Sequence, residues 1–425
     1  MNYKTPKGTK DILPNESYIW QYVEEKAKNI FNNANYKEIR TPIFETTELF
    51  ARGVGDSTDI VNKEMYTFVQ KERSLTLRPE NTAGVVRAFI ENGMHRYPTP
   101  VKLWYKGPMF RYERPQAGRQ RQFHQLGVEL FGIEGASADA EVIQIAMNLL
   151  DELGLKNLSL EINNIGCPKC RNAYKQSIKE VVSSKLSEFC EDCHLRFKKN
   201  PLRMLDCKND KCKEILSGPE IEAVINKDFV CEDCVKHFSD LQGYLRILNI
   251  DYVINKRLVR GLDYYNRTVF EITSTNLGAQ NAVCGGGRYD PLVEMLGGVP
   301  TPAVGWAFGM ERIISLMPDL EEKPLDVFIV TNNTKKAFEL AGNFRKEGIS
   351  CDFDLANRKF QKQLEKASKC GAKFALILGE EELSSRVMTL KKMETGDQWK
   401  LRSFEVVTQM IFNANYMYEE MELEL

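Results

Sequence analysis

Eight of the eleven cysteines lie in one short stretch of the chain, and this clustering restricts the fold more than any other feature. They form four close pairs with the spacings C-x2-C, C-x2-C, C-x4-C and C-x2-C. The pairs are Cys167 and Cys170, Cys190 and Cys193, Cys207 and Cys212, and Cys231 and Cys234. Without a secretory signal, paired thiols favour a metal site or redox chemistry over a disulfide framework. Two zinc sites with four thiolates each would use all eight, and reduced thiols packed as small hydrophobic groups are the alternative.

Length and composition predict a multidomain enzyme or binding protein. A chain of 425 residues is expected to form two or three domains, and its 43% hydrophobic content is that of a packed protein. The 58 basic and 59 acidic residues nearly cancel, so any contact with nucleic acid must come from local patches. No apolar stretch approaches the roughly 20 residues that span a bilayer, and the first residues carry no hydrophobic run. We therefore expect a cytoplasmic protein with no membrane contact.

Hydrophobic patterns divide the chain into four segments. Residues 1–165 and 249–320 alternate strand and helix patterns as two parts of one mainly antiparallel α+β domain, and the cysteine-rich residues 166–248 are inserted between them. Residues 325–425 begin with a βαβαβ alternation, which predicts a parallel sheet. Near the start, Ser17 is expected to cap a helix that ends at residues 32–35, and residues 36–44 to form an edge strand containing Pro42.

Three arginine-bearing segments point to a polyanionic ligand. Residues 102–122 contain six basic residues against one acid, Glu113, and an arginine fork suits phosphate, although a solvated basic hairpin is the alternative. Arg260 precedes two consecutive tyrosines, one of which is expected to face a pocket. Arg312 lies at a predicted helix start, where backbone donors favour anions. Together with Arg111, these arginines are what a triphosphate site requires. The glycines at 285–287 match no phosphate-loop frame, so they predict a turn or a close strand approach.

Long strings within these segments resemble the class II aminoacyl-tRNA synthetases, and within them the bacterial histidyl-tRNA synthetases. The strings are PKGTKD at 6–11, the region of Pro42, TLRPENT at 76–82, FRYERPQAGRQRQFHQ at 110–125, LVRGLDYY at 258–265 and GWAFGMER at 305–312. The resemblance spans nearly the whole chain. It implies an antiparallel class II catalytic domain with a Cys-rich insertion, followed by a C-terminal α/β anticodon-binding domain.

The resemblance also implies a reaction and its site. Histidine and ATP would form histidyl-adenylate, and the histidyl group would pass to the terminal adenosine of histidine tRNA. Arg111 and Arg260 would act on the α-phosphate, Arg260 taking a role that magnesium has in related enzymes. Magnesium would still accompany the outer phosphates. The remaining ATP contacts implied are Glu113, Arg119, Phe123 and Arg312.

For L-histidine, the family pattern assigns Glu80, Thr82 and Gln125 to the α-ammonium group, and Glu129, Tyr264 and Tyr265 to the imidazole. A carboxylate and a phenol suit a ring with one donor and one acceptor. A capping role for Glu80 at the helix that follows is the alternative. His124 is expected to be a packed residue rather than a general base.

On the RNA side, the resemblance assigns Arg114 and Gln116 to the extra 5′ guanosine of histidine tRNA. A basic stripe on a helix at 357–373 would contact the anticodon arm, unless it is a solvated face. Zinc is not part of the family pattern. In a zinc-bound insertion, Arg196, Lys198, Lys199 and Arg203 would contact the tRNA acceptor arm. The first class motif, around Pro42, implies a homodimer.

Two other classes of function compete with this reading. Paralogues of these synthetases act as non-catalytic regulatory subunits of ATP phosphoribosyltransferase, but they usually lack the C-terminal domain and the arginines. A zinc-dependent nucleic-acid-binding module would explain the cysteines and not the arginines.

Overall fold

An eight-stranded sheet forms the centre of the first of two units into which the chain separates, Met1–Leu320 and Glu321–Leu425. The computed structural model describes residues 3–55, 58, 60–115, 118–227, 229–275 and 281–423, and of residues 415–423 only the backbone. Among the described residues, no helix combines the length and the apolar character needed to cross a membrane.

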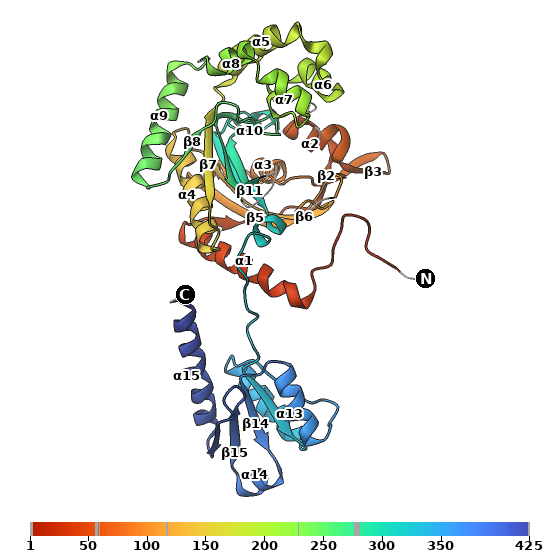
Figure 1. Cartoon of the computed structure of the whole chain (residues 1–425), viewed down its shortest axis with the longest axis vertical. Helices are drawn as coiled ribbons and strands as arrows, with labels where there is room; N and C mark the ends of the chain where they lie inside the picture. The colour runs from red at the N-terminus through yellow and green to blue at the C-terminus, as the bar shows by residue number, and fades with distance from the viewer. Residues whose placement is uncertain are drawn as a thin grey trace. The chain divides into compact units, whose positions relative to one another are not determined.

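The strand order of this sheet is β1-β5-β6-β11-β10-β9-β7-β8, and Figure 1 shows it at the centre of the unit. The outer pairs β1–β5 and β7–β8 are parallel and the other pairs are antiparallel. The strands are β1 (Lys37–Glu38), β5 (Val101–Phe110), β6 (Gln122–Phe131), β7 (Leu158–Asn164), β8 (Val253–Ile254), β9 (Asn266–Ser274), β10 (Ala282–Arg288) and β11 (Ala303–Gly309). The predicted antiparallel catalytic architecture is confirmed.

Helices cover both faces of the sheet because its strands alternate apolar side chains toward each face. Trp104 of β5 packs with the core under α1 and α4, whereas its neighbours Leu103 and Tyr105 pack with the core under α3 and α10. The helices of this part are α1 (Pro14–Asn33), α2 (Thr47–Val54), α3 (Thr82–Glu91), α4 (Ser137–Glu152), α10 (Leu292–Met295) and α11 (Met310–Ile314). A three-stranded sheet of order β2-β4-β3 completes it, formed by β2 (Phe44–Thr46), β3 (Tyr66–Gln70) and β4 (Arg73–Leu77).

Two predictions near the start of the chain are wrong. Helix α1 begins at Pro14, so Ser17 lies inside it and does not cap it; the rigid φ of proline suits a first helical turn. The expected strand over residues 36–44 is divided into β1 and β2, and Pro42 lies in the link between them. A proline in that link supplies no ladder donor, which is consistent with the break.

The glycine-rich segment is strand β10, as its lack of a phosphate-loop frame indicated. It lies between β9 and β11, and Arg288 at its end is fully buried against Asp139, with 2.6 Å between Nη2 and Oδ1. The Asp139 carboxylate also lies 2.6 Å from Nε2 of His237. This buried network joins the sheet, α4 and the last helix of the insertion.

We expect Gly286→Ala to destabilise the first unit by about 1–3 kcal/mol, because a methyl group there overpacks the sheet. A Cβ atom on Gly286 would lie 2.4 Å from the Gly305 carbonyl oxygen and 2.6 Å from Cβ of Trp306. The matched control is Gly243→Ala in helix α9 (Glu232–Ile247), where a Cβ meets nothing within 4 Å and alanine should stabilise the helix by about 0.5–1 kcal/mol. Urea unfolding of the two variants measures the difference, and equal midpoints would contradict it.

The cysteine-rich insertion is helical and has its own hydrophobic core. Its helices are α5 (Pro168–Ser183), α6 (Glu191–Lys199), α7 (Asp210–Leu216), α8 (Pro219–Asn226) and α9 (Glu232–Ile247). Ile178, Val182, Met204, Leu216 and Ile221 are all nearly inaccessible within that core. In Figure 1, α5 to α8 gather over one end of the central sheet.

The second unit has the predicted α/β pattern. Its sheet has the order β13-β12-β14-β15-β16, with parallel pairing at β12 and an antiparallel hairpin at the other edge. Its elements are β12 (Val327–Thr331), α12 (Thr334–Lys346), β13 (Cys351–Phe353), α13 (Phe360–Lys369), β14 (Phe374–Leu378), α14 (Glu380–Ser385), β15 (Met388–Lys392), β16 (Gln398–Leu401) and α15 (Phe404–Leu423).

Candidate active site

A cavity of about 640 Å³ opens at the middle of the large sheet and brings together segments that lie far apart in the sequence. Its walls come from the start of α3, the β5–β6 connection, the residues before β9, strands β10 and β11, and α11. The predicted site residues that line it are Glu80, Thr82, Arg111, Glu113, Arg119, Phe123, Gln125, Arg260, Tyr264, Tyr265 and Arg312. Glu129 is not among the lining residues, but it contacts two of them.

Glu80 lies at one end of the cavity and caps helix α3. Its carboxylate accepts hydrogen bonds from the backbone N–H groups of Thr82 (2.8 Å) and Ala83 (2.9 Å). The capping role considered from the sequence is therefore present, and it holds the carboxylate in the wall of the cavity. Burial raises the pKa of Glu80, although both N–H bonds oppose the shift.

Glu129 on β6 is buried under the same end of the cavity. Its carboxylate accepts hydrogen bonds from the hydroxyl groups of Thr82 (2.7 Å) and Tyr289. Burial raises its pKa to about 8, and the nearby Glu80 carboxylate contributes to the increase. A group with this pKa changes charge near neutral pH and suits recognition of a ring that also titrates there.

Both consecutive tyrosines line the cavity, as the family resemblance implied, whereas strand alternation alone predicted one. Tyr264 and Tyr265 lie in the turn before β9 and not on a strand, so the two-face alternation does not apply to them. Their rings are 4.6 Å apart between centroids, and the Tyr264 ring meets Tyr289 edge-on at 5.6 Å. Three phenols thus surround the carboxylate end.

Arginines form the opposite part of the cavity wall. Arg111, at the end of β5, donates through Nε to the Pro79 carbonyl oxygen at 2.8 Å, and its guanidinium lies over the Phe123 ring at 5.2 Å. Glu113 accepts a hydrogen bond from Arg119 at 2.7 Å, which positions that side chain across the loop. Planar guanidinium groups held in this way are prepared to bind phosphate oxygens.

Arg260 is held against strand β10 by an ion pair with Glu271. A Cβ atom at position 285 would lie 1.9 Å from Nη2 of Arg260, so glycine is required for this approach. Burial alone would lower the pKa of Arg260, but the Glu271 carboxylate raises it above its usual value. Arg312 shows the reverse: burial and then the neighbouring Arg119 lower its pKa, and the Glu271 and Glu113 carboxylates only partly oppose this decrease.

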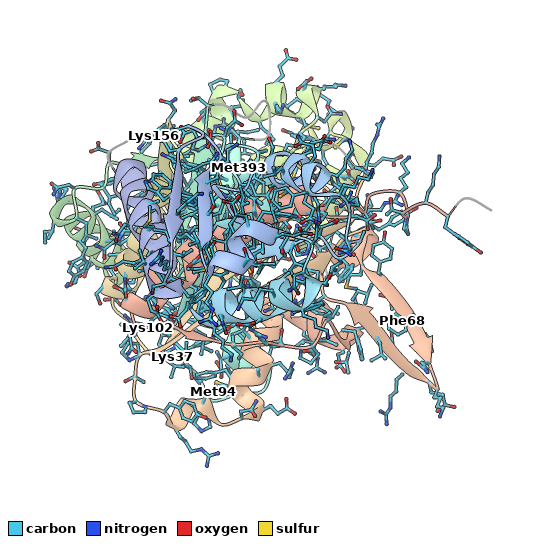
Figure 2. The ribbon with its side chains drawn as sticks, turned by 90° about the horizontal axis from the view of Figure 1, so that it is seen from below. Lys37, Phe68, Met94, Lys102, Lys156 and Met393 are labelled. Carbon is cyan, nitrogen blue, oxygen red and sulfur yellow. The ribbon has the colours of Figure 1, made fainter. Side chains whose placement is uncertain are left out.

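The basic segment 102–122, predicted to bind an anion, contains fewer unpaired cations than its composition suggests. Lys102 pairs with Glu141 of α4 at 2.5 Å, and Lys106 pairs with Glu24 of α1. Figure 2 shows Lys102 near Lys37, at the β1 edge of the sheet. The anion site is therefore formed by the arginines of this segment and not by its lysines, because acids distant in the sequence neutralise the lysines.

Sequence reasoning missed two residues of the site. Tyr289 and Glu271 both line the cavity, one bonded to Glu129 and the other to Arg260. Tyr289 follows the glycine-rich strand within GGGRYD at 285–290, and a polar aromatic directly after a close-packed strand was the available signal. Glu271 lies on β9 with no distinguishing neighbour in the sequence.

Other predicted site residues lie away from the cavity wall or cannot be placed. Arg114 is exposed on the connection after β5, and Gln116 falls outside the described residues. The eight cysteines lie in the insertion and form two groups of four. His124 packs edge-on against Trp20 and bonds to Glu311, in agreement with its expected structural role.

The pKa of Glu129 predicts a stability effect between pH 4.5 and 8. Because its pKa rises from 4.5 to about 8 on folding, the native state binds more protons than the unfolded state in this window. The contribution of Glu129 to the free energy of unfolding therefore falls as the pH rises from 4.5 to 8, by at most about 1.4 kcal/mol per pH unit. Above pH 8 this contribution stays constant. Glu129→Gln should remove this component. Urea midpoints of both proteins from pH 5 to 8 measure it, and parallel curves would contradict the assignment.

The cavity thus joins a cation-accepting end to an anion-binding end. Carboxylates and phenols suit an ammonium group and a nitrogen heterocycle, whereas fixed arginines suit a phosphate chain. Two residues of the cavity lining, Gln125 and Arg260, each have a buried atom without a hydrogen-bond partner, Oε1 and Nε respectively, to which a polar ligand could bond. The arrangement can hold a positively charged amino acid next to a nucleotide.

Comparisons with known proteins agree with this geometry. The family model described as "Histidyl-tRNA synthetase" matches residues 8–179 and 210–313, and the one described as "Anticodon binding domain" matches residues 326–411. The chain is 48% identical over 416 residues to the histidine–tRNA ligase of Acetivibrio thermocellus, covering 96% of this chain and 99% of that protein. It is 47% identical to that of Clostridium novyi, covering 97% and 100%.

Solved structures give the same result. The apo histidyl-tRNA synthetase of S. aureus matches with a TM-score of 0.80 and 38% identity, covering 96% of this chain and all of that one. A Bacillus halodurans protein described as an ATP phosphoribosyltransferase regulatory subunit/histidyl-tRNA synthetase matches with a TM-score of 0.66 and 22% identity, covering 89% and 99%; it shares the fold.

The antiparallel catalytic sheet, its cavity and the anticodon-binding unit define a class II aminoacyl-tRNA synthetase. Within that class, the chain belongs to the histidyl-tRNA synthetase family.

Proposed function

We propose that this chain acts as a histidine–tRNA ligase and that the cavity carries out both steps of the reaction. A carboxylate oxygen of L-histidine attacks the α-phosphorus of ATP, the bond to the β-phosphate bridge breaks, and pyrophosphate leaves. A hydroxyl group of the terminal adenosine of histidine tRNA then attacks the histidyl carbonyl and releases AMP. The observation that carries this proposal is the single cavity with carboxylates at one end and arginines at the other.

The arginine end is proposed to bind ATP. Arg111 and Arg260 would contact the α-phosphate from two sides, and Arg312 the outer phosphates. Attack by a carboxylate on a charged phosphate needs neutralisation and alignment, which fixed guanidinium groups supply without reorganisation. Glu113 and Arg119 would complete the site, with adenine on Phe123. Magnesium is proposed to accompany the β- and γ-phosphates, because hard oxygen ligands suit it.

The carboxylate end is proposed to bind histidine. The family pattern puts the α-ammonium group near Glu80, Thr82 and Gln125. The imidazole would lie against Glu129 and Tyr264, with Tyr265 beside them and Tyr289 holding the Glu129 carboxylate. A buried carboxylate next to phenol groups rejects side chains that cannot hydrogen-bond to it.

Contacts with histidine tRNA are proposed at two places. Arg114 and Gln116 would read the 5′ end, and exposed Arg114 is accessible for this. Helix α13 would contact the anticodon arm, but the charge of this segment is partly compensated. Arg358, two residues before the helix begins, pairs with Asp354 at 2.7 Å, and Lys366 in the helix pairs with Asp352 at 3.3 Å. The basic stripe is therefore weaker than its sequence indicates.

A homodimer is proposed through the small sheet that follows Pro42. Phe44, Leu75, Leu77, Tyr66 and Phe68 share one face of β2-β4-β3 by their register. Phe44 is 52% exposed and Phe68 41% exposed, which is unusual for paired apolar strands. Figure 2 shows Phe68 on the hairpin that projects from the body of the unit. A second copy of the chain is the proposed partner, and sedimentation of Phe68→Ser against wild type tests it.

The remaining expectations stay proposals. The catalytic domain is proposed to consist of residues 1–165 and 249–320, with the insertion at 166–248 and the anticodon-binding domain at 325–425. The protein is proposed to act in the cytoplasm. Zinc is proposed for the insertion, where thiolate ligands favour it over magnesium.

Histidine-dependent exchange of pyrophosphate into ATP tests the function. Purified protein should catalyse it with histidine and not with other amino acids, and exchange no faster than background would overturn the proposal. The same assay separates the ligase from a regulatory subunit and from a nucleic-acid-binding module, because neither of these activates an amino acid.

A further inference from the structure

The eight clustered cysteines separate into two groups of four. Cys167, Cys170, Cys231 and Cys234 form the outer cluster, and Cys190, Cys193, Cys207 and Cys212 form the inner cluster; within each, all sulfur atoms lie within 4.8 Å of one another. All eight are free thiols. The sulfur atoms of Cys167 and Cys170 are 3.5 Å apart, and those of Cys190 and Cys207 are 3.8 Å apart. Four ligands at a Zn–S distance of about 2.3 Å in a tetrahedron would be separated by about 3.8 Å.

Backbone donors point at the sulfur atoms of both clusters. In the outer cluster the two pairs exchange bonds: Cys167 N–H donates to Sγ of Cys234, and Cys231 N–H donates to Sγ of Cys170, both at 3.2 Å. In the inner cluster, Cys190 N–H donates to Sγ of Cys212 at 3.3 Å. Hydrogen bonds from N–H groups stabilise sulfur as a thiolate, which is the form that binds metal.

Helix starts add to this effect. Cys167, Cys190 and Cys231 each precede the first residue of a helix, α5, α6 and α9, and the second cysteine of each pair lies in the first turn. The positive end of a helix stabilises a thiolate. Four thiolates brought this close would repel one another, and a cation between them would remove that repulsion, so the donors and the clustering together favour a bound metal.

The two clusters are nested. The outer cluster joins the start of the insertion to its end, where the chain leaves β7 and where α9 returns toward the sheet. The inner cluster lies within the insertion core and is more buried, with Cys193 and Cys212 almost inaccessible. Each cluster therefore closes a separate loop of the chain, which suits a small helical domain with a limited core.

The inner cluster also adjoins the catalytic cavity. Leu205, Asp206 and Lys208, the neighbours of Cys207, line the cavity wall. Asn200, five residues before Leu205, donates a hydrogen bond to the Asp263 carboxylate at 2.6 Å. On the outer side, Arg171 follows Cys170 and donates to the carbonyl oxygens of Asp263 (3.1 Å) and Tyr265 (2.5 Å). The insertion thus holds the segment that carries Arg260 and the two tyrosines.

We propose that the outer and inner clusters are two separate tetrathiolate zinc sites, and that the inner zinc holds residues 205–208 in place as a wall of the catalytic cavity. The second part rests on the proposed function of that cavity.

The predicted tRNA contacts of the insertion differ in exposure. Lys198 and Lys199 are exposed, whereas Arg203, expected from the sequence to contact tRNA, is buried.

Metal content of paired variants tests the sites. Protein purified without chelator should hold about two zinc ions per chain, and cobalt substitution should give the ligand-field spectrum of tetrahedral thiolate coordination. Cys193→Ser with Cys207→Ser should lose one zinc, Cys170→Ser with Cys234→Ser the other, and Cys170→Ser with Cys193→Ser both. Cys370→Ser, an exposed cysteine outside the clusters, is the control. The proposed sites would be overturned by less than half an equivalent of zinc per wild-type chain. They would also be overturned if the variant with one substitution in each cluster, Cys170→Ser with Cys193→Ser, lost a single zinc.

Kinetics test the coupling to the cavity. Loss of the inner zinc should raise the KM for ATP in the exchange assay at least about tenfold, because a displaced wall misplaces the phosphates. Unfolding of part of the sample would lower kcat alone, so the KM separates positioning from instability. Asn200→Ala should raise the same KM while keeping both zinc ions, and Glu214→Ala, exposed on α7, should not. An unchanged KM after loss of the inner zinc would overturn the coupling, whereas a wild-type protein without exchange would overturn the proposed function and leave the zinc counts valid.

Discussion

Replacing Arg260 by alanine is expected to lower kcat for histidine-dependent ATP–pyrophosphate exchange about 10²–10³-fold. The side chain is held by an ion pair with Glu271 against the glycine at 285, so in the proposed site its charge would already be in position when the α-phosphate gains negative charge. Removing it also leaves the Glu271 carboxylate facing the phosphates. The variant therefore loses the attraction between the guanidinium group and the α-phosphate, and it also loses the neutralisation of Glu271. Both losses slow the attack on the α-phosphate.

Three further variants make the Arg260 prediction specific. Arg260→Lys should keep part of the activity, because it retains the charge and loses the planar fork. Glu271→Gln introduced together with Arg260→Ala should recover part of the loss, since it removes the unshielded carboxylate. Arg267→Ala, in the same strand region and paired with Glu134 outside the cavity, is the control and should leave exchange unchanged. Full activity of Arg260→Ala would refute the role given to this residue.

Replacing Glu129 by alanine is expected to lower kcat/KM for histidine about 10²-fold, with little change in the KM for ATP. The change removes the proposed acceptor for the imidazole N–H group. It also leaves the hydroxyl groups of Thr82 and Tyr289 buried without their present partner. A buried polar group without a partner costs more than the average hydrogen bond contributes.

Glu129→Gln separates the two parts of that effect. The two hydroxyl groups now donate to different carboxylate oxygens of Glu129. In glutamine the amide oxygen can accept from one of them and the NH2 group can donate to the other, so the variant should bind histidine better than Glu129→Ala and worse than wild type. Steady-state exchange over a range of histidine concentrations measures the order. A wild-type KM for histidine in both variants would show that the imidazole lies elsewhere.

Local patterns predicted most elements of the fold. The alternation over residues 327–378 correctly predicted β12, α12, β13, α13 and β14. Short loops join these elements, and the hydrophobic periodicity of a strand differs clearly from that of a helix. Residues 36–44 failed because apolar content alone cannot show that a proline-containing link interrupts pairing. At residues 264 and 265 the strand-alternation argument expected one tyrosine in the pocket, because the strand was assumed to begin too early, whereas the family resemblance assigned both tyrosines to the pocket.

Residue types predicted the chemistry of the candidate site better than they predicted its charge. The arginines and carboxylates expected to form the site do line or adjoin one cavity, since long motifs carry them in order. The partners of Lys102 and Lys106 could not be found in the same way, because Glu141 and Glu24 lie on other elements. The pairing of Glu271 with Arg260 was missed for a similar reason, because Glu271 lies on β9 and Arg260 lies in the segment before that strand.

Residue identity and spacing alone showed which groups this protein can use: arginine forks, two carboxylates, paired tyrosines and eight thiols at ligand spacing. These follow from residue identity and short-range spacing, which do not depend on the rest of the chain. Which of these groups come into contact depends on the folded chain. It divided the thiols into an outer and an inner cluster, removed two lysines from the anion site, and brought Tyr289 to Glu129. Contacts between distant segments depend on how strands pair and helices pack, and that information lies in the fold.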